Sequence, residues 1–178
     1  MKVIIGRYPD RKWYHKLLGL LPKRKEKIKI DTWDTYNIDN TLGLIITPLL
    51  KEFIKVHNGS PAVLDEDVPH KYKKISAPAL NEKDIENGVV DINYHKRWDW
   101  VLGEMLFAFE STTRDWEQDF STGEIDIEIK TIPGSDTSYM EEGPNHTYVM
   151  DEEARDACEK RILNGFRLFG KYYNNLWD

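Results

Sequence analysis

Residues that build covalent or metal-stabilised sites are scarce in this chain. Its 178 residues include one cysteine, Cys158, which excludes an internal disulfide and any zinc site with several cysteine ligands. Cys158 also has no neighbouring histidine in sequence to deprotonate it, so we do not expect a cysteine nucleophile. The five histidines, none paired at the close spacing of zinc ligands, are His15, His57, His70, His95 and His146.

Long apolar runs and signature motifs are missing as well. No apolar run reaches the roughly 18 residues that span a bilayer, and Met1–Gly6 is far too short for a signal peptide. We therefore expect a soluble, cytoplasmic protein. The chain has no phosphate-binding loop of the G-x-x-x-x-G-K-[ST] type, no dinucleotide fingerprint and no G-x-S-x-G elbow. This lack of a catalytic signature favours a protein that is not an enzyme, and no cofactor is expected.

Positive charge is concentrated at one end of the chain. The first 29 residues hold ten Lys or Arg side chains and two acids, a local charge of +8, whereas the whole chain carries −6. Such an end is expected to attract phosphates or anionic partners. Aromatic residues lie between these cations. A cation beside a ring is the pairing that holds a nucleotide, because the charge binds the phosphate and the ring stacks on the base.

We predict that this segment binds a phosphate-bearing small molecule such as a nucleotide. The candidate phosphate ligands are Arg7, Arg11 and Lys12. The candidate stacking residues are Tyr8, Trp13 and Trp33. The alternative interpretation is a solvated surface loop whose Trp13 packs into the core. A pI near 5.4 does not favour nucleic acid as the partner, since coating a polyanion uses a basic protein surface.

Apolar periodicity predicts three long helices. The first follows Asp39 as its N-cap and ends at Asn58–Gly59. A kink is expected at Pro48, because proline cannot donate the helical hydrogen bond. The second helix runs from His95 to Glu110, and the third is capped by Asp151.

Short strands and loops fill the rest of the chain. The apolar run in Lys2–Gly6 predicts a short strand, and the alternation in Lys27–Asp31 predicts a half-buried one. A hairpin is predicted to pair Ser121–Lys130 with Asn145–Met150 across a long connection. Residues 60–93 are polar, contain three prolines and are predicted to form a long loop. We therefore predict a single α+β domain over residues 1–178, with three long helices packed against a few short antiparallel strands.

The second predicted helix carries apolar residues on two sides. Trp100 and Phe107 lie opposite its predicted core stripe, which consists of Trp98, Val101, Leu102, Met105, Leu106 and Phe109. The third helix contains Gly165 and Gly170, which predict close approach of another backbone. A helix that is apolar on two sides is buried on two sides, either by the strands or by a second copy of the chain. We favour the second copy and predict a homodimer.

An acidic cluster offers an alternative, enzymatic interpretation. Asp31, Asp34 and Asp39 lie between a predicted strand and a predicted helix, and Glu104 of the second helix could join them to hold Mg²⁺ in a phosphohydrolase site. The simpler interpretation is that the aspartates cap turns and helix starts. No tight D-x-D or E-x-x-E spacing within this set strengthens the metal interpretation.

Four ordered motifs resemble a family of uncharacterised small proteins of tailed bacteriophages. They are Ile30–Thr35 with Asp39–Leu42, Asp65–Pro69, Lys96–Val101 and Asn164–Tyr172. The resemblance covers nearly the whole chain from about residue 28 onward. It implies phage origin and expression in the cytoplasm of a bacterial host, and it brings no activity with it.

Charge, aromatic residues and this resemblance together predict a non-catalytic phage accessory protein. In this hypothesis the protein captures a phosphate-bearing small molecule and so sequesters a nucleotide signal of host defence. The first alternative is the metal-dependent phosphohydrolase. The second is an interaction module that blocks a host protein through the acidic body of the chain.

Overall fold

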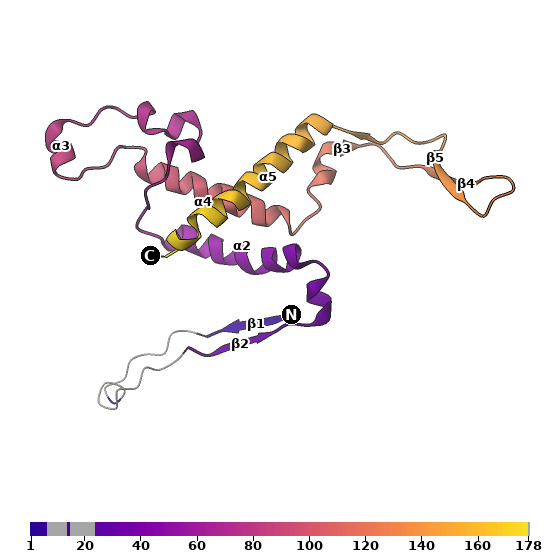
Figure 1. Ribbon diagram of the computed structural model, residues 1–178, viewed down its shortest axis with the longest axis horizontal. Coiled ribbons are helices and arrows are strands. Elements are labelled where there is room, and N and C mark those ends of the chain that lie inside the picture. Colours follow the sequence, from indigo (N-terminus) through magenta and orange to yellow (C-terminus); the bar gives the residue numbers. More distant parts are fainter. Residues whose placement is uncertain (7–13, 15–23, 178) are drawn as a thin grey trace. The chain divides into compact units, whose positions relative to one another are not determined.

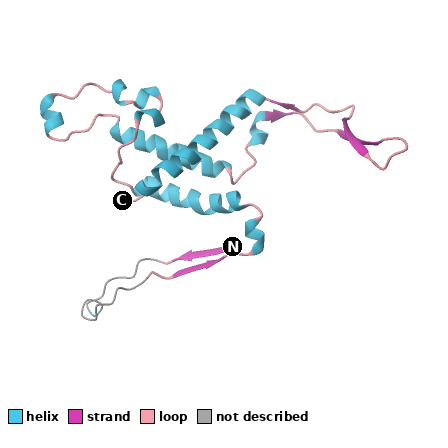
Figure 2. Cartoon of the chain, in the orientation of Figure 1, coloured by secondary structure: helices cyan, strands magenta, loops and turns pink. Residues whose placement is uncertain are grey.

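The computed structural model describes residues 1–6, 14 and 24–177. The chain, predicted as one domain, divides into two compact units, Met1–Thr41 and Leu42–Asp178, and each is described by itself. The described residues form three long helices and several two-stranded antiparallel sheets, which confirms the predicted α+β class (Figures 1 and 2).

The first unit contains a two-stranded ribbon. Strands β1 (Lys2–Ile5) and β2 (Glu26–Lys29) pair antiparallel, close to the predicted ranges. The 3-10 helix η1 (Thr32–Thr35) follows, and the first residues of α2 complete the unit. The prediction that the second strand is half-buried is wrong: Ile28 is 61% exposed and all four residues of β2 are exposed, because among the described residues β2 pairs only with β1.

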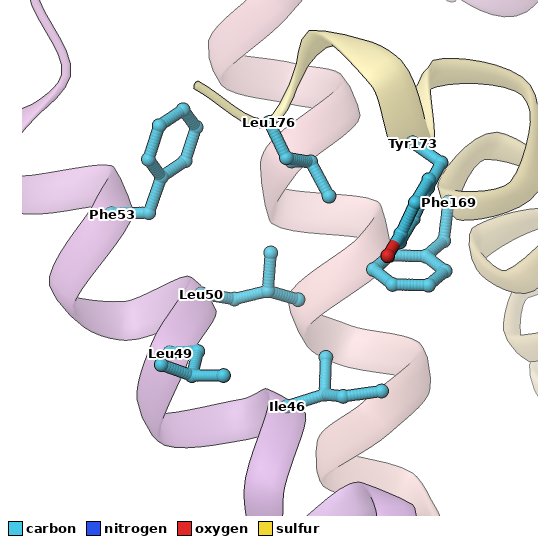
Figure 3. Close-up of a pocket in the computed structure, with 7 residues that line it drawn as sticks. All are labelled: Ile46, Leu49, Leu50, Phe53, Phe169, Tyr173 and Leu176. Carbon is cyan, nitrogen blue, oxygen red and sulfur yellow. The ribbon is translucent and has the colours of Figure 1, made fainter. Parts of the chain in front are cut away.

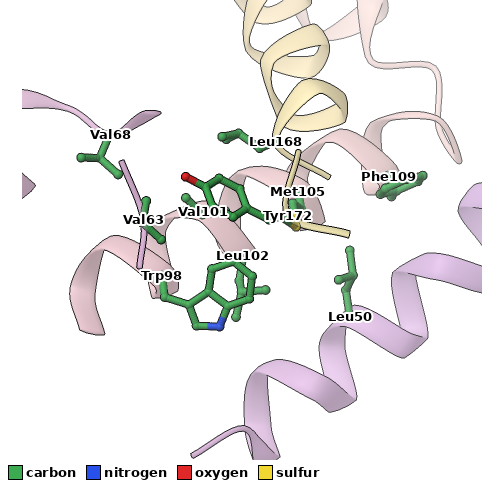
Figure 4. Close-up of a cluster of buried hydrophobic side chains, with 10 residues drawn as sticks. All are labelled: Leu50, Val63, Val68, Trp98, Val101, Leu102, Met105, Phe109, Leu168 and Tyr172. Atoms are coloured by element: carbon green, nitrogen blue, oxygen red, sulfur yellow. The ribbon is translucent and has the colours of Figure 1, made fainter. Parts of the chain in front are cut away.

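The second unit is centred on two helices, α4 (Tyr94–Ser111) and α5 (Glu152–Tyr172). The predicted stripe of α4 forms the core, and its fully buried members are Trp98, Val101, Leu102 and Met105 (Figure 4). The predicted N-cap of α5 is confirmed, because the Asp151 carboxylate accepts a hydrogen bond from the Ala154 N–H at 3.0 Å.

One of the two predicted glycine contacts is confirmed. A Cβ atom at Gly165 would lie 2.4 Å from the Glu104 carbonyl oxygen and 2.6 Å from the Ala108 Cβ, so α4 and α5 approach each other closely there. The same prediction for Gly170 is wrong, because nothing lies within 4 Å of a Cβ built at that position.

Helix α2 (Ile38–Val56) contributes a third layer to the core of the second unit. It continues past Pro48, and Leu50 enters the buried cluster beside α4 and α5. Gly43 is buried near the other end of the helix. A Cβ atom there would lie 2.2 Å from the Thr112 hydroxyl oxygen and 3.1 Å from the Phe109 carbonyl oxygen, so α2 packs closely against the end of α4 at this glycine.

The predicted loop of residues 60–93 contains only short elements. They are the 3-10 helices η2 (Asp65–Asp67), η3 (His70–Tyr72) and η4 (Lys74–Ser76) and the short helix α3 (Glu82–Glu86). Val63 and Val68 anchor the segment in the core.

Buried ionic contacts hold this segment on the helices. Asp67 accepts hydrogen bonds from the Tyr172 hydroxyl and the Arg167 guanidinium, both at 2.7 Å, and pairs with Lys171 at 2.6 Å. Asp91 pairs with Arg97 of α4, whose guanidinium also donates to the Tyr72 carbonyl. Helix α5 thus holds the segment near its beginning, at Asp67, and helix α4 holds it near its end, at Asp91. These contacts hold it in place without a long helix or strand of its own.

The predicted hairpin is built as two successive ribbons. Strands β3 (Ser121–Thr122) and β6 (Val149–Met150) pair after the 3-10 helix η5 (Glu117–Phe120), as predicted for the ends of the hairpin. The prediction is wrong for the outer part, where β4 (Ile127–Thr131) pairs with β5 (Ser138–Glu142), a strand within the predicted connection. A final 3-10 helix, η6 (Tyr173–Asn175), follows α5.

Candidate anion-binding site

One face of the β1–β2 ribbon carries a cluster of lysines. Cross-strand partners share a face, and Lys2 lies directly opposite Lys29 while Ile4 lies opposite Lys27. All three lysines are exposed, and none has an ion pair with another residue of the described parts of the chain. Like charges placed directly opposite each other destabilise a ribbon. An anion bound on this lysine face (Lys2, Lys27, Lys29) would relieve that repulsion.

The ribbon ends where the undescribed basic segment begins. The Gly6 N–H donates to the Lys25 carbonyl at 2.9 Å, and the Arg24 Nε–H donates to the Gly6 carbonyl at 2.6 Å. Five of the six predicted ligand residues follow Gly6 and lie outside the described residues; they are Arg7, Tyr8, Arg11, Lys12 and Trp13. The ribbon therefore joins the lysine face directly to both ends of the segment that contains them.

Trp33, the sixth predicted ligand residue, belongs to a pair of exposed rings. It lies in η1 and is 77% exposed, and Tyr36 beside it is 71% exposed. Their ring centroids are 5.4 Å apart with an angle of 39° between the ring planes. Sequence reasoning missed Tyr36, although its spacing of three residues from Trp33 was a signal that the two rings share one side of a helical turn.

A short network fixes these rings at the Lys2–Lys29 end of the ribbon. Asp31 accepts a hydrogen bond from the Trp33 N–H at 3.3 Å, and Asp34 accepts one from the Asp31 N–H at 2.8 Å, which together form a capping box. The amino group of Met1 also pairs with Asp34 at 3.0 Å. Because Met1 adjoins Lys2 and Asp34 adjoins Trp33, the lysine face and the aromatic pair are neighbours within the first unit.

Two of the four predicted metal ligands are used as caps. The hydrogen bond from the Asp31 N–H, followed by the contact with the Met1 amino group, holds the pKa of Asp34 below its usual range. Asp31 caps η1, and Asp39 is an exposed residue in the first turn of α2. The roles of Asp31 and Asp34 match the simpler interpretation of the aspartates as capping residues. The prediction that Asp39 is the N-cap of the first long helix is wrong, because α2 already begins at Ile38.

Glu104, the fourth predicted metal ligand, is buried and bound by Arg161. Its carboxylate accepts hydrogen bonds from Nε at 3.1 Å and Nη2 at 2.8 Å of Arg161, and this contact raises the pKa of the guanidinium. Throughout residues 1–6, 14 and 24–177, no group of three or more His, Cys, Asp or Glu side chains is placed to hold a metal ion. The metal interpretation gains no support from these contacts.

A groove in the second unit is apolar, whereas the β1–β2 ribbon carries lysines. It measures about 460 Å³, lies between α2 and the end of α5, and is lined by apolar side chains together with Tyr173 (Figure 3). The lining residues are Ile46, Leu49, Leu50, Phe53, Phe169, Tyr173 and Leu176. None of them is a cation, so this groove cannot neutralise a phosphate.

The aromatic residues that motivated the homodimer have partners within one chain. Trp100 packs against the core cluster, and the guanidinium carbon of Arg161 lies 3.8 Å from the Phe107 ring centroid. Both rings are only partly exposed. The second apolar face of α4 is thus covered at least in part by α5 and the core.

Comparisons of this chain with protein-family models, with curated proteins and with solved structures find no match. The resemblance to phage proteins therefore stays a prediction. None of the helices in the described parts of the chain is long and apolar enough to cross a membrane.

Proposed function

We propose that the protein binds a phosphate-bearing small molecule through its first unit and does no chemistry on it. The observation that carries this proposal is the lysine face, where Lys2 and Lys29 lie directly opposite each other without a described counter-ion. Charge repulsion makes such a pair costly unless an anion is bound. The site is completed by a base-stacking surface, the exposed rings of Trp33 and Tyr36.

In this proposal the undescribed segment supplies further ligands. Arg7, Arg11 and Lys12 hold phosphate oxygens, and Tyr8 or Trp13 adds a stacking face. The biological role that we propose is that of a phage accessory protein in the cytoplasm of a bacterial host, where it sequesters a nucleotide signal of host defence. The support for this role is the motif resemblance together with the charge of the first 29 residues.

Titration calorimetry with a panel of linear and cyclic nucleotides tests the proposal. We expect heat of binding from at least one member at protein concentrations in the tens of micromolar, and a loss of at least about tenfold in affinity for Lys2→Glu/Lys29→Glu. The matched control is Lys160→Glu, which reverses an exposed lysine in the second unit. Absence of heat with every nucleotide would refute the proposal.

A second candidate function rests on the β4–β5 ribbon. Ile129 and Met140 are cross-strand partners on one of its faces and are 73% and 76% exposed, while Glu128 and Glu141 lie opposite each other on the other face. An exposed apolar face beside carboxylates suits a basic protein partner. In this alternative the protein blocks a host factor, and Ile129→Lys/Met140→Lys would prevent co-purification of that factor.

We also propose a homodimer, as expected from the sequence. Since Trp100 and Phe107 have partners within one chain, a dimer would have to bury what remains exposed of these two rings. Sedimentation measures the oligomeric state of the wild type and of Trp100→Glu, and a homodimer predicts that the variant is the smaller species. A wild type that runs as a 20.9 kDa monomer at micromolar concentration would rule the dimer out.

A further inference from the structure

The ribbon and the ring pair form an elongated site. Lys27 and Lys29 are two residues apart on β2 and share one face, and Lys25 continues the same alternation beyond the strand. A strand rises about 3.3 Å per residue, so the cations from Lys25 to Lys29 extend over roughly 13 Å. The aromatic pair of Trp33 and Tyr36 then extends the site at the Lys29 end.

A row of cations that leads to two adjacent exposed rings fits a chain of nucleotides better than one nucleotide. Sequence-independent binding of single strands combines a positive track for the backbone with aromatic faces for successive bases. Two neighbouring rings offer faces to more than one base, whereas a mononucleotide has one base to stack. Paired bases of a duplex are already stacked on each other, so these rings select an unpaired strand.

We propose that the first unit binds single-stranded nucleic acid, with phosphates along the lysine face and bases on Trp33 and Tyr36. This inference rests on the proposed phosphate binding and specifies its ligand class. It departs from the expectation that nucleic acid is not the partner. That expectation was drawn from the pI of the whole chain, whereas a bound strand meets the local charge of the first 29 residues.

Fluorescence anisotropy with labelled oligothymidylates of increasing length tests the inference on the full chain. We expect affinity to rise with length up to about 12 nucleotides, within the usual range for a single-strand site. The affinity should fall as salt is raised from about 50 to 200 mM, because bound lysines release counterions. A hairpin duplex of the same length should bind more weakly.

Two matched pairs of variants assign the contacts. Trp33→Ala should weaken binding between about 5-fold and 150-fold, whereas Trp177→Ala, at a tryptophan of similar exposure in the second unit, should leave it unchanged. Lys27→Ala/Lys29→Ala should lower the slope of log affinity against log salt by about 0.7 for each lysine. Lys160→Ala should not change that slope. Circular dichroism of each variant verifies that the fold is kept.

The outcomes separate this inference from the proposed function. If mononucleotides bind and length brings no gain, or if duplex binds as well as single strand, the single-strand inference is overturned while phosphate binding stands. If neither nucleotides nor oligonucleotides bind, both are overturned. Length-dependent binding that Trp33→Ala does not weaken would also overturn the inference, because the rings would then have no part in it.

Discussion

Asp91 and Arg97 form a buried, bidentate ion pair. The Nη2–Oδ2 and Nη1–Oδ1 distances are 2.7 Å and 3.0 Å, and the two side chains are 6% and 5% exposed. Removing one partner leaves the other charge buried and unpaired. We therefore expect Asp91→Ala to lower the free energy of unfolding by about 3–5 kcal/mol, measured by urea denaturation.

The exposed pair of Arg114 and Asp119 is the matched control. Both side chains are about half exposed, so Asp119→Ala should cost less than about 1 kcal/mol. If Asp91→Ala and Asp119→Ala lowered the free energy of unfolding equally, burial would not determine how much each ion pair contributes to stability.

Two glycines in one helix should respond in opposite directions to alanine. Gly165→Ala places a methyl group against the Glu104 backbone, so we expect overpacking to lower the free energy of unfolding by about 1–3 kcal/mol. Gly170→Ala fills open space and lowers the backbone entropy of the unfolded chain, so it should raise the free energy of unfolding by about 0.5–1 kcal/mol. Thermal or urea denaturation of both variants measures the difference. Destabilisation by Gly170→Ala would show that a neighbour contacts that position.

Asp67 should make stability depend on acid pH. Burial raises the pKa of this carboxyl, but hydrogen bonds from Lys171, Tyr172 and Arg167 outweigh burial and hold the pKa below its usual value. The stability that it contributes is therefore complete above the unfolded pKa of about 3.9 and is lost as the pH falls through the lower folded pKa. We expect Asp67→Asn to flatten the fall in unfolding free energy below about pH 4. An unchanged acid profile in that variant would refute this role.

Cys158 should react slowly with thiol reagents. Burial raises the pKa of its thiol, and the positive charges of Arg114 and Arg161 offset only part of that effect. Because the thiolate is the reactive form, alkylation at neutral pH should be slower than for a free thiol and should speed up when urea unfolds the chain. A folded rate equal to the unfolded rate would contradict the raised pKa.

Local patterns could predict much of the fold. The stripe of Trp98, Val101 and Met105 identified the core face of α4, and the alternation around Ile28 identified β2. Both signals depend only on residues close together in sequence. The burial of that strand could not be predicted, because alternation does not say whether another layer covers the apolar side.

Contacts between distant residues were beyond sequence reasoning. Gly165 and Gly170 look alike in sequence, and only the packing of α4 on α5 distinguishes them. For the candidate site, Trp33 was among the stacking residues predicted from the sequence. The pairing of Lys2 with Lys29 required the strand register, which the sequence pattern alone did not define.

The contact between Asp67 and Tyr172 joins residues 105 positions apart. During synthesis, therefore, the segment around Asp67 leaves the ribosome long before its partner exists. Helix α4 likewise emerges before α5, so Trp98 and Leu102 remain exposed until α5 has been made. This exposed hydrophobic surface can bind chaperones or neighbouring chains. Contacts between residues so far apart in sequence form slowly. During synthesis, therefore, the second unit should fold in one step, and only after α5 has been made.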